Sequence, residues 1–264
     1  MSETSKDQSI EAALALPGRK IVLLIEDNSD IRKFITEQLE DQYHVITASN
    51  GKEGIKYAEK FVPDLIITDV MMPEMDGITM VKVLRKNELT NHIPIIMLTG
   101  KVMQEDKMEG LETGIDAYLT KPFSVSELEL RITNLINQRE QLRLKYSNTY
   151  VVDPKETSLT TIDQHFLENT HTCIRENLGQ TSFGVEQLAE KMCLSASQLH
   201  RKLEALTDQT PGHLIRNMRL QKAAELIRQN TGNLAEICFL TGFNDQTYFS
   251  RAFKNQFGCS PNFL

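Results

Sequence analysis

The sequence predicts an α/β domain with a doubly wound, five-stranded parallel sheet, followed by an all-α domain that contains two helix-turn-helix units. Two observations predict this fold class. Between Lys20 and about residue 140, five short apolar runs alternate with amphipathic stretches of helical periodicity, which is the pattern of repeated β–α units. Beyond residue 160, helical patterns continue without a credible strand. The length of 264 residues suits two domains of ordinary size.

The chain divides into four predicted segments. They are an N-terminal tail at 1–18, the α/β domain at 19–144, a linker at 145–163 and the helical domain at 164–264. The linker is polar, and Asp153-Pro154 within it is unfavourable to a helix.

The elements of the first domain follow from their apolar patterns. For example, residues 65–67 form an apolar run with β-branched members, which suits a strand covered on both faces. The predicted strands are 21–25, 44–47, 65–67, 94–98 and 117–119. The predicted helices are 29–40, 52–60, 78–86, a weaker one near 104–113, and a last one from about 124 into the 140s. Right-handed crossovers then gather the carboxyl ends of all five strands on one edge of the sheet.

The second domain reads as two helix-turn-helix units joined by a longer helix. The predicted helices are 166–178, 185–192, one capped by Ser195, one from Pro211 to about Gln229, 234–240 and 245–257. Leucines at 199, 203 and 206 form the apolar stripe of the first unit, and phenylalanines at 249, 253 and 257 form that of the second. In each unit, polar side chains lie on the opposite face of the second helix and could contact a partner.

Polar residues stand at four of the predicted strand ends. They are Glu26 and Asp27 after the first strand, Asp69 after the third, Thr99 and Gly100 after the fourth, and Lys121 after the fifth. Three carboxylates in one crevice repel each other unless a cation lies among them, and all-oxygen ligation suits Mg²⁺. Asp69 is then placed to attack a phosphoryl group as a nucleophile, while Thr99 and Lys121 contact the phosphoryl oxygens.

With these residues in place, the segment from about 19 to 140 resembles the receiver domain of two-component response regulators. The resemblance implies the strand order 2-1-3-4-5 and a histidine kinase as phosphodonor. It implies that Asp69 is the phosphoacceptor, and that Glu26, Asp27, Asp69 and the Met71 backbone carbonyl hold Mg²⁺. Thr99 and Tyr118 match the positions that switch on activation, and the Lys121-Pro122 peptide is expected to be cis. The resemblance also implies that the protein forms a homodimer when it is phosphorylated.

Each unit consists of a short helix, a turn and a longer helix, which is the arrangement of proteins that insert a helix into the DNA major groove. A plain helical bundle fits the same pattern. The sequences RKLEALTDQTPGHLIRNMRLQKAAELI and GFNDQTYFSRAFKNQFGCSP resemble the AraC-type DNA-binding domain over about 164–264. The resemblance implies double-stranded DNA as a partner. The base-facing candidates are Ser197, His200 and Arg201 in the first unit, and Gln246, Thr247 and Arg251 in the second, with Lys254 expected at a phosphate.

The composition excludes several classes of protein. No apolar stretch is long enough for a membrane span, and no signal peptide is evident at the start, so we expect a cytoplasmic protein that does not enter a membrane. Residues 1–140 carry a net charge of −8 and residues 141–264 a net charge of +1, so DNA binding has to depend on locally placed cations. Four cysteines without a C-x-x-C pair predict buried, reduced thiols.

The sequence therefore predicts a phosphorylation-controlled transcription factor rather than an enzyme, and its domain order resembles the C-terminal part of hybrid two-component proteins. Two alternatives remain open at this point. One is a phosphatase or phosphotransferase with an aspartyl nucleophile, although Met71 stands where a D-x-D signature would place its second carboxylate. The other is a signalling adaptor that does not bind DNA.

Overall fold

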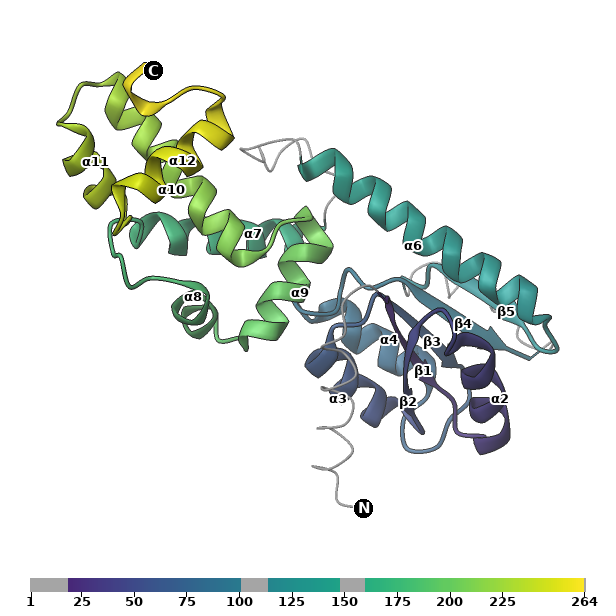
Figure 1. The fold of residues 1–264 in the computed structure, drawn as a ribbon. Coiled ribbons are helices and arrows are strands. Elements are labelled where there is room, and N and C mark those ends of the chain that lie inside the picture. Colours follow the sequence, from purple (N-terminus) through teal and green to yellow (C-terminus); the bar gives the residue numbers. More distant parts are fainter. Residues whose placement is uncertain (1–18, 101–113, 148–159, 264) are drawn as a thin grey trace. The chain divides into compact units, whose positions relative to one another are not determined.

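The computed structural model describes residues 19–100, 114–147 and 160–263, and the chain divides into two compact units, residues 1–148 and 149–264 (Figure 1). The helix expected near 104–113 and most of the predicted linker lie outside the described residues. None of the described helices combines the length and the apolar character that crossing a membrane requires.

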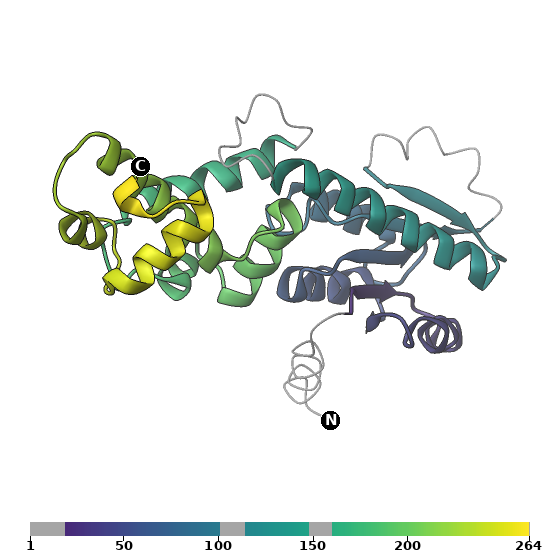
Figure 2. The same ribbon diagram turned by 45° about the horizontal axis from the view of Figure 1, so that its top comes forward.

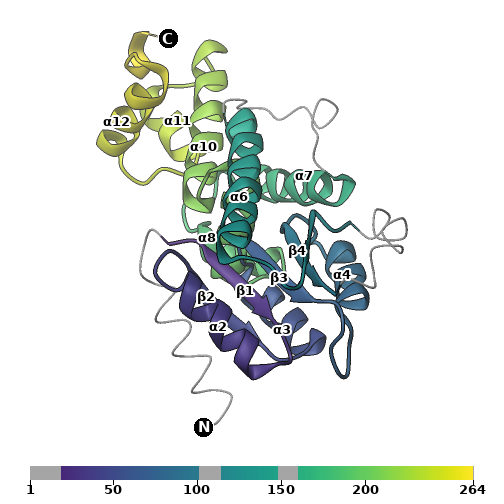
Figure 3. The same cartoon turned by 90° about the vertical axis from the view of Figure 1, so that its right-hand side faces the viewer.

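The first unit contains one parallel sheet in the order β2-β1-β3-β4-β5. Figure 3 labels the first four of these strands in that order. The strands of the sheet are β1 (Ile21–Ile25), β2 (His44–Ala48), β3 (Leu65–Asp69), β4 (Ile95–Thr99) and β5 (Ala117–Thr120). The structure confirms the predicted fold class and strand order. Four strands, β2 to β5, end one or two residues later than predicted, because parallel pairing continues to these ends, with Asp69 opposite Leu98 and Thr99 opposite Thr120.

Among the described residues, four helices cover this sheet, two on each face. They are α2 (Ser29–Leu39), α3 (Gly51–Phe61), α4 (Gly77–Lys86) and α6 (Val125–Ser147). Figure 2 shows helices packed along the strands. Neighbouring strand residues point to opposite faces, so Leu23 packs with α3 and α4, whereas Val22 and Leu24 pack with α2 and α6. Burial of every β1 side chain on one face or the other explains its uninterrupted apolar sequence.

Local capping explains where these helices begin. Asn28, Asn50 and Asp76 each accept a hydrogen bond from a main-chain N–H in the first turn of α2, α3 and α4 respectively. Because each cap directly follows a strand end or its loop, the helices start close to the edge where the polar residues gather.

The second unit consists of helices only among its described residues. They are α7 (Thr161–Glu176), α8 (Val185–Lys191), α9 (Ala196–Thr207), α10 (Pro211–Arg228), α11 (Leu234–Leu240), α12 (Gln246–Phe257) and the short 3₁₀ helix η3 (Pro261–Phe263). One apolar core joins α7, α8, α9 and the start of α10, and a second joins the rest of α10 to α11 and α12. Helix α10 therefore connects the two helix-turn-helix units by contributing to both cores.

Three expectations differ from the structure. Helix α6 continues to Ser147, and α7 begins at Thr161 because Thr160 caps it, so both edges of the predicted linker are helical. The expectation of buried thiols is wrong for Cys193, which is exposed, whereas Cys238 is buried. Cys193 occupies the turn between α8 and α9 with a left-handed φ of 56°, outside the buried faces of both helices.

Candidate functional site

The predicted polar residues of the first unit meet at the carboxyl edge of its sheet. Glu26 and Asp27 follow β1, and Asp69 ends the neighbouring strand β3. The chain leaves β1 for β2 on one side and later returns to β3 on the other, so this is the point where strand order reverses. The structure thus brings together residues that are more than 40 positions apart in the sequence.

Lys121 connects the two most enclosed carboxylates. Its Nζ lies 2.7 Å from Glu26 Oε2 and 2.9 Å from Asp69 Oδ2. The other carboxylate oxygen of Asp69 accepts a hydrogen bond from the Val70 main-chain N–H at 2.7 Å. These contacts fix the Asp69 carboxylate at the mouth of the crevice, where its side chain is 16% exposed.

The charges in the crevice alter each other's ionisation. Burial raises the pKa of Glu26, which is 1% exposed, and Lys121 offsets only part of that effect. Burial alone would lower the pKa of Lys121, but its contacts with Glu26 and Asp69 raise it instead. One lysine therefore contacts two of the carboxylates, while Asp27 adds a third, exposed one.

The remaining predicted residues of this edge lie around the carboxylates. Thr99 is buried, and its hydroxyl donates to the Gly100 carbonyl at 3.1 Å. Tyr118 is half-buried against the core on the α3 and α4 side of the sheet. The Met71 side chain is 71% exposed. The Lys121-Pro122 peptide bond is cis, as the resemblance implied.

In the second unit, the predicted DNA-contacting residues lie opposite the buried stripes of α9 and α12. Leu199 and Leu203 are fully buried in α9, whereas Ser197 is exposed and His200 pairs with Glu204 at 3.3 Å on the outer face. Arg201 is half-buried. In α12, Phe249 and Phe253 are fully buried. The exposed residues of α12 include Gln246, Thr247, Arg251 and Lys254.

Comparison with protein families decides the identity of the two units. Residues 22–133 match the response regulator receiver domain, and residues 188–264 match a helix-turn-helix domain. The first unit is a response regulator receiver domain. The second is an AraC-type helix-turn-helix domain.

Known proteins resemble this chain over one or both domains. A histidine kinase of Formosa agariphila is 34% identical over 97% of this chain, which spans 19% of that protein. The alkaline phosphatase synthesis regulator PhoP of Bacillus subtilis is 44% identical over 46% of this chain and half of its own length. A solved receiver domain of a Pseudomonas aeruginosa sensor histidine kinase, with magnesium in its active-site cleft, is 30% identical over 46% of this chain and 99% of that chain, with a TM-score of 0.43.

The donor set of the receiver domain fits a hard divalent cation. Ligand atoms of Glu26, Asp27 and Asp69 all lie within 4.8 Å of one another. Three carboxylates so close together leave a net negative charge even with Lys121 beside them, and oxygen ligands are those that Mg²⁺ prefers.

Sequence reasoning missed two residues that position the receiver crevice. The Arg32 guanidinium, on α2, donates to the main-chain carbonyls of Glu26 at 2.5 Å and Asp27 at 3.2 Å. Gly77 starts α4 so close to β3 that an added Cβ would lie 2.2 Å from the Asp69 carbonyl oxygen. An arginine one turn into the helix after the acidic pair was the available signal for the first of them.

A third missed feature is a buried ion pair in the helix-turn-helix domain. Lys202 of α9 is 0% exposed, and its Nζ lies 2.5 Å from Oδ1 of Asp163, which is 2% exposed at the start of α7. The ammonium group also lies 5.6 Å from the centre of the Phe166 ring. This pair fixes the first turn of α7 against the helix that carries Ser197, His200 and Arg201.

Proposed function

We propose that this chain is a phosphorylation-dependent transcriptional regulator, in which a histidine kinase phosphorylates Asp69 and the helix-turn-helix domain binds specific DNA. The observation that carries the proposal is the Asp69 carboxylate, placed between two acidic residues and a lysine at the strand-order reversal of a receiver domain. The similarity of nearly the whole chain to part of a histidine kinase supports a kinase as phosphodonor, either separate or in the same polypeptide.

In the proposed reaction, a carboxylate oxygen of Asp69 attacks the phosphorus of a phosphohistidine. The new P–O bond forms as the P–N bond breaks, and the imidazole leaves with its electron pair and takes up a proton. Lys121 lies beside the attacking carboxylate and stabilises negative charge on the phosphoryl oxygens, and Thr99 supplies a hydroxyl donor. When bound by Glu26, Asp27, Asp69 and the Met71 carbonyl, Mg²⁺ would add charge neutralisation at the phosphoryl group.

The test of this step is labelling of the full chain with a small acyl phosphate in the presence of Mg²⁺. We expect Asp69→Asn to abolish acid-stable, base-labile phosphate, because the Asp69 carboxylate is 16% exposed beside Lys121, whereas Glu26, which also contacts Lys121, is 1% exposed. Asp41→Asn is the matched control, since Asp41 is an exposed aspartate outside the crevice. Equal labelling of the wild type and Asp69→Asn would contradict the assignment.

On DNA, we propose that the arginines read bases and that Lys254 contacts a phosphate. A bidentate arginine–guanine pair is worth about 1–3 kcal/mol of discrimination, so Arg251→Ala and Arg201→Ala should each relax preference at one base position of separate half-sites. Lys254→Ala should weaken all sequences alike and reduce the salt slope by about 1. Since Ala196 offers no cationic contact in the first unit, we expect the second unit to dominate affinity.

Selection from a randomised duplex library, performed with each variant at two salt concentrations, separates these roles. If the arginine variants lost affinity with unchanged base preference, or if Lys254→Ala changed base preference, the proposed division would be wrong.

A further inference from the structure

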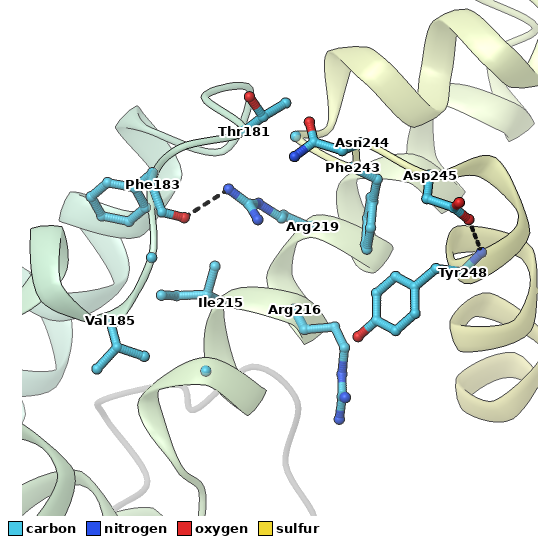
Figure 4. Close-up of a pocket in the computed structure, with 13 residues that line it drawn as sticks. Thr181, Phe183, Val185, Ile215, Arg216, Arg219, Phe243, Asn244, Asp245 and Tyr248 are labelled. Carbon is cyan, nitrogen blue, oxygen red and sulfur yellow. Dashed lines mark hydrogen bonds between the residues drawn. The ribbon is translucent and has the colours of Figure 1, made fainter.

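A cleft of about 360 Å³ opens inside the second domain, between its two helix-turn-helix units (Figure 4). One side is formed by the segment that leads into α8, with Phe183 and Val185, and the floor by the first half of α10. The other side is formed by the turn before α12 and by Tyr248 in its first turn. The cleft therefore lies at the junction that α10 makes between the two units.

The charged groups of the cleft differ in what they already bind. The Arg219 guanidinium donates to the main-chain carbonyls of Leu178, Gln180 and Phe183, at distances between 2.7 and 3.3 Å. The Asp245 carboxylate accepts the Tyr248 main-chain N–H as the N-cap of α12. Arg219 and Asp245 therefore already make hydrogen bonds within the domain.

Arg216 is the exception. It is half-buried on α10, and among the residues that the structure describes it makes no hydrogen bond or ion pair. Its charge acts on His213, whose pKa is lowered by burial and by Arg216. In Figure 4 the hydroxyl end of Tyr248 points toward the side chain of Arg216, which comes from α10 on the floor of the cleft. An unpaired guanidinium and a phenol hydroxyl offer hydrogen-bond donors to an anion.

The cleft adjoins the surface expected to read DNA. Tyr248 directly follows Thr247, and its ring centre lies 5.8 Å from the guanidinium carbon of Arg251. Thr247 and Arg251 are both base-facing candidates. On the other side, Val185 begins α8, the positioning helix that precedes α9. When two reading helices of one domain enter successive stretches of major groove, the sugar–phosphate backbone between those stretches passes the junction of the two units.

We propose that this cleft holds one phosphate of the DNA backbone between the two half-sites, bound by the Arg216 guanidinium and the Tyr248 hydroxyl. This inference rests on the proposed DNA binding and adds a contact that neither reading helix makes with its base-facing side chains. The apolar side chains of Val185, Ile215 and Phe243 line the same cleft, so water is partly excluded around Arg216 and its attraction to a phosphate is strengthened.

Arg216→Ala in the full chain tests the proposal through its salt dependence. Each neutralised phosphate contributes about 0.9 to the slope of log affinity against log salt. The ratio of the wild-type DNA affinity to that of Arg216→Ala should therefore fall about 3.5-fold between 50 and 200 mM salt. Tyr248→Phe removes a neutral donor and keeps the ring, so it should weaken binding at both salt concentrations without changing the slope.

Arg228→Ala is the matched control, because Arg228 lies exposed at the far end of the same helix and does not line the cleft. Its slope should equal that of the wild type. Duplexes with a neutral methylphosphonate at single positions provide a second measurement. One position between the half-sites should weaken the wild type and leave Arg216→Ala unaffected.

Three outcomes bear on the inference in different ways. If the wild type binds DNA while Arg216→Ala keeps the wild-type slope and its sensitivity to every methylphosphonate, the inference is overturned and the proposed function stands. If inorganic phosphate stabilises the wild type through Arg216 without any change in the DNA slope, the cleft is a free-anion site and the inference is again overturned. If the wild type binds no duplex, the proposed function itself fails.

Discussion

At the scale of single residues, Arg32 shows how a side chain outside the receiver crevice fixes the groups inside it. Its guanidinium bonds to the main-chain carbonyls of the two consecutive acidic residues, Glu26 and Asp27. These bonds orient the loop after β1 through its main chain and involve neither carboxylate. Groups that orient the ligands of a metal site typically affect metal affinity by 10- to 100-fold.

We therefore predict that Arg32→Ala lowers the affinity for Mg²⁺ by roughly 10-fold, because the loop that carries two of the three carboxylates loses its restraint. Isothermal titration calorimetry of the full chain with Mg²⁺ measures this effect. The matched control is Lys33→Ala, since Lys33 is the next residue on α2 and its 77% exposed side chain pairs with Glu37 on the same helix. Equal affinities for the wild type and Arg32→Ala would show that the loop is held by other contacts.

At the scale of secondary-structure elements, α7 and α9 are joined by the Asp163–Lys202 pair. Both side chains are almost fully buried, and Thr160 also donates its hydroxyl to the Asp163 carboxylate at 2.8 Å. A buried pair contributes little net stability compared with apolar residues of the same size, but removing one partner leaves an unpaired buried charge. The pair therefore acts mainly to fix how α9 lies against α7.

Lys202→Met should lower the free energy of unfolding by about 3–5 kcal/mol, because Asp163 would keep a buried charge without its partner. The double variant Asp163→Leu, Lys202→Met should recover most of that loss. Urea unfolding followed by circular dichroism measures both. A double variant that is as unstable as the sum of the two single variants would mean that the residues contribute independently.

Helix α4 begins at a charged cap whose contribution depends on pH. Asp76 accepts hydrogen bonds from the Thr79 main-chain N–H at 2.8 Å and from its hydroxyl at 2.7 Å. Burial alone would raise the pKa of Asp76, but these donors lower it. Since the folded-state pKa is below the unfolded value of about 3.9, the stabilisation is complete above that pH and is lost as pH falls through the folded-state pKa.

Asp76→Ala should lower the free energy of unfolding at pH 7 by about 0.5–2 kcal/mol, and this difference should shrink as the pH falls below about 4. Asp76→Asn is the comparison variant, because asparagine also caps a helix but does not titrate, so its loss of stability at pH 7 should be smaller than that of Asp76→Ala and should diminish over the same pH range. Calorimetric unfolding between pH 3 and pH 7 provides the measurement. A difference for Asp76→Ala that stays constant over this range would exclude a role for the carboxylate charge.

At the scale of the whole molecule, the two parts of the chain differ in net charge. The acidic residues are concentrated before residue 140, with a net charge of −8, whereas the remainder is nearly neutral at +1. Phosphorylation adds further negative charge to the acidic part, so electrostatic attraction to DNA does not increase through the receiver domain itself. Any gain in DNA binding then has to come through a change in association or in domain arrangement.

We predict that phosphorylation drives dimerisation of the receiver domain through the face beside Tyr118 and α6, where Leu130 is 61% exposed. The gain in association should be about 1–3 kcal/mol, the usual range of allosteric coupling. Sedimentation of the full chain with and without beryllium fluoride, a phosphoryl mimic, measures it. Asp69→Asn should not respond, and an unchanged association state of the wild type would contradict the prediction.

The sequence by itself determined the fold class and the members of the receiver crevice. Apolar runs and helical stripes are local patterns, and in a parallel sheet the carboxyl ends of the strands share one edge. Residues at those ends, such as Glu26, Asp69 and Lys121, could therefore be grouped without coordinates. Strand and helix ends were less predictable, as at Ser147 and Thr161, because pairing and capping extend elements beyond their apolar positions.

Only the tertiary structure decided which side chains from distant elements meet. Lys202 lies on the apolar stripe of α9 and is buried because Asp163, 39 residues earlier, supplies its counter-charge. Arg216 and Tyr248 share one cleft because α10 packs into both cores of the domain. Helical periodicity gives the face on which a residue lies, but the partner on that face depends on the packing of whole helices, which no local pattern encodes.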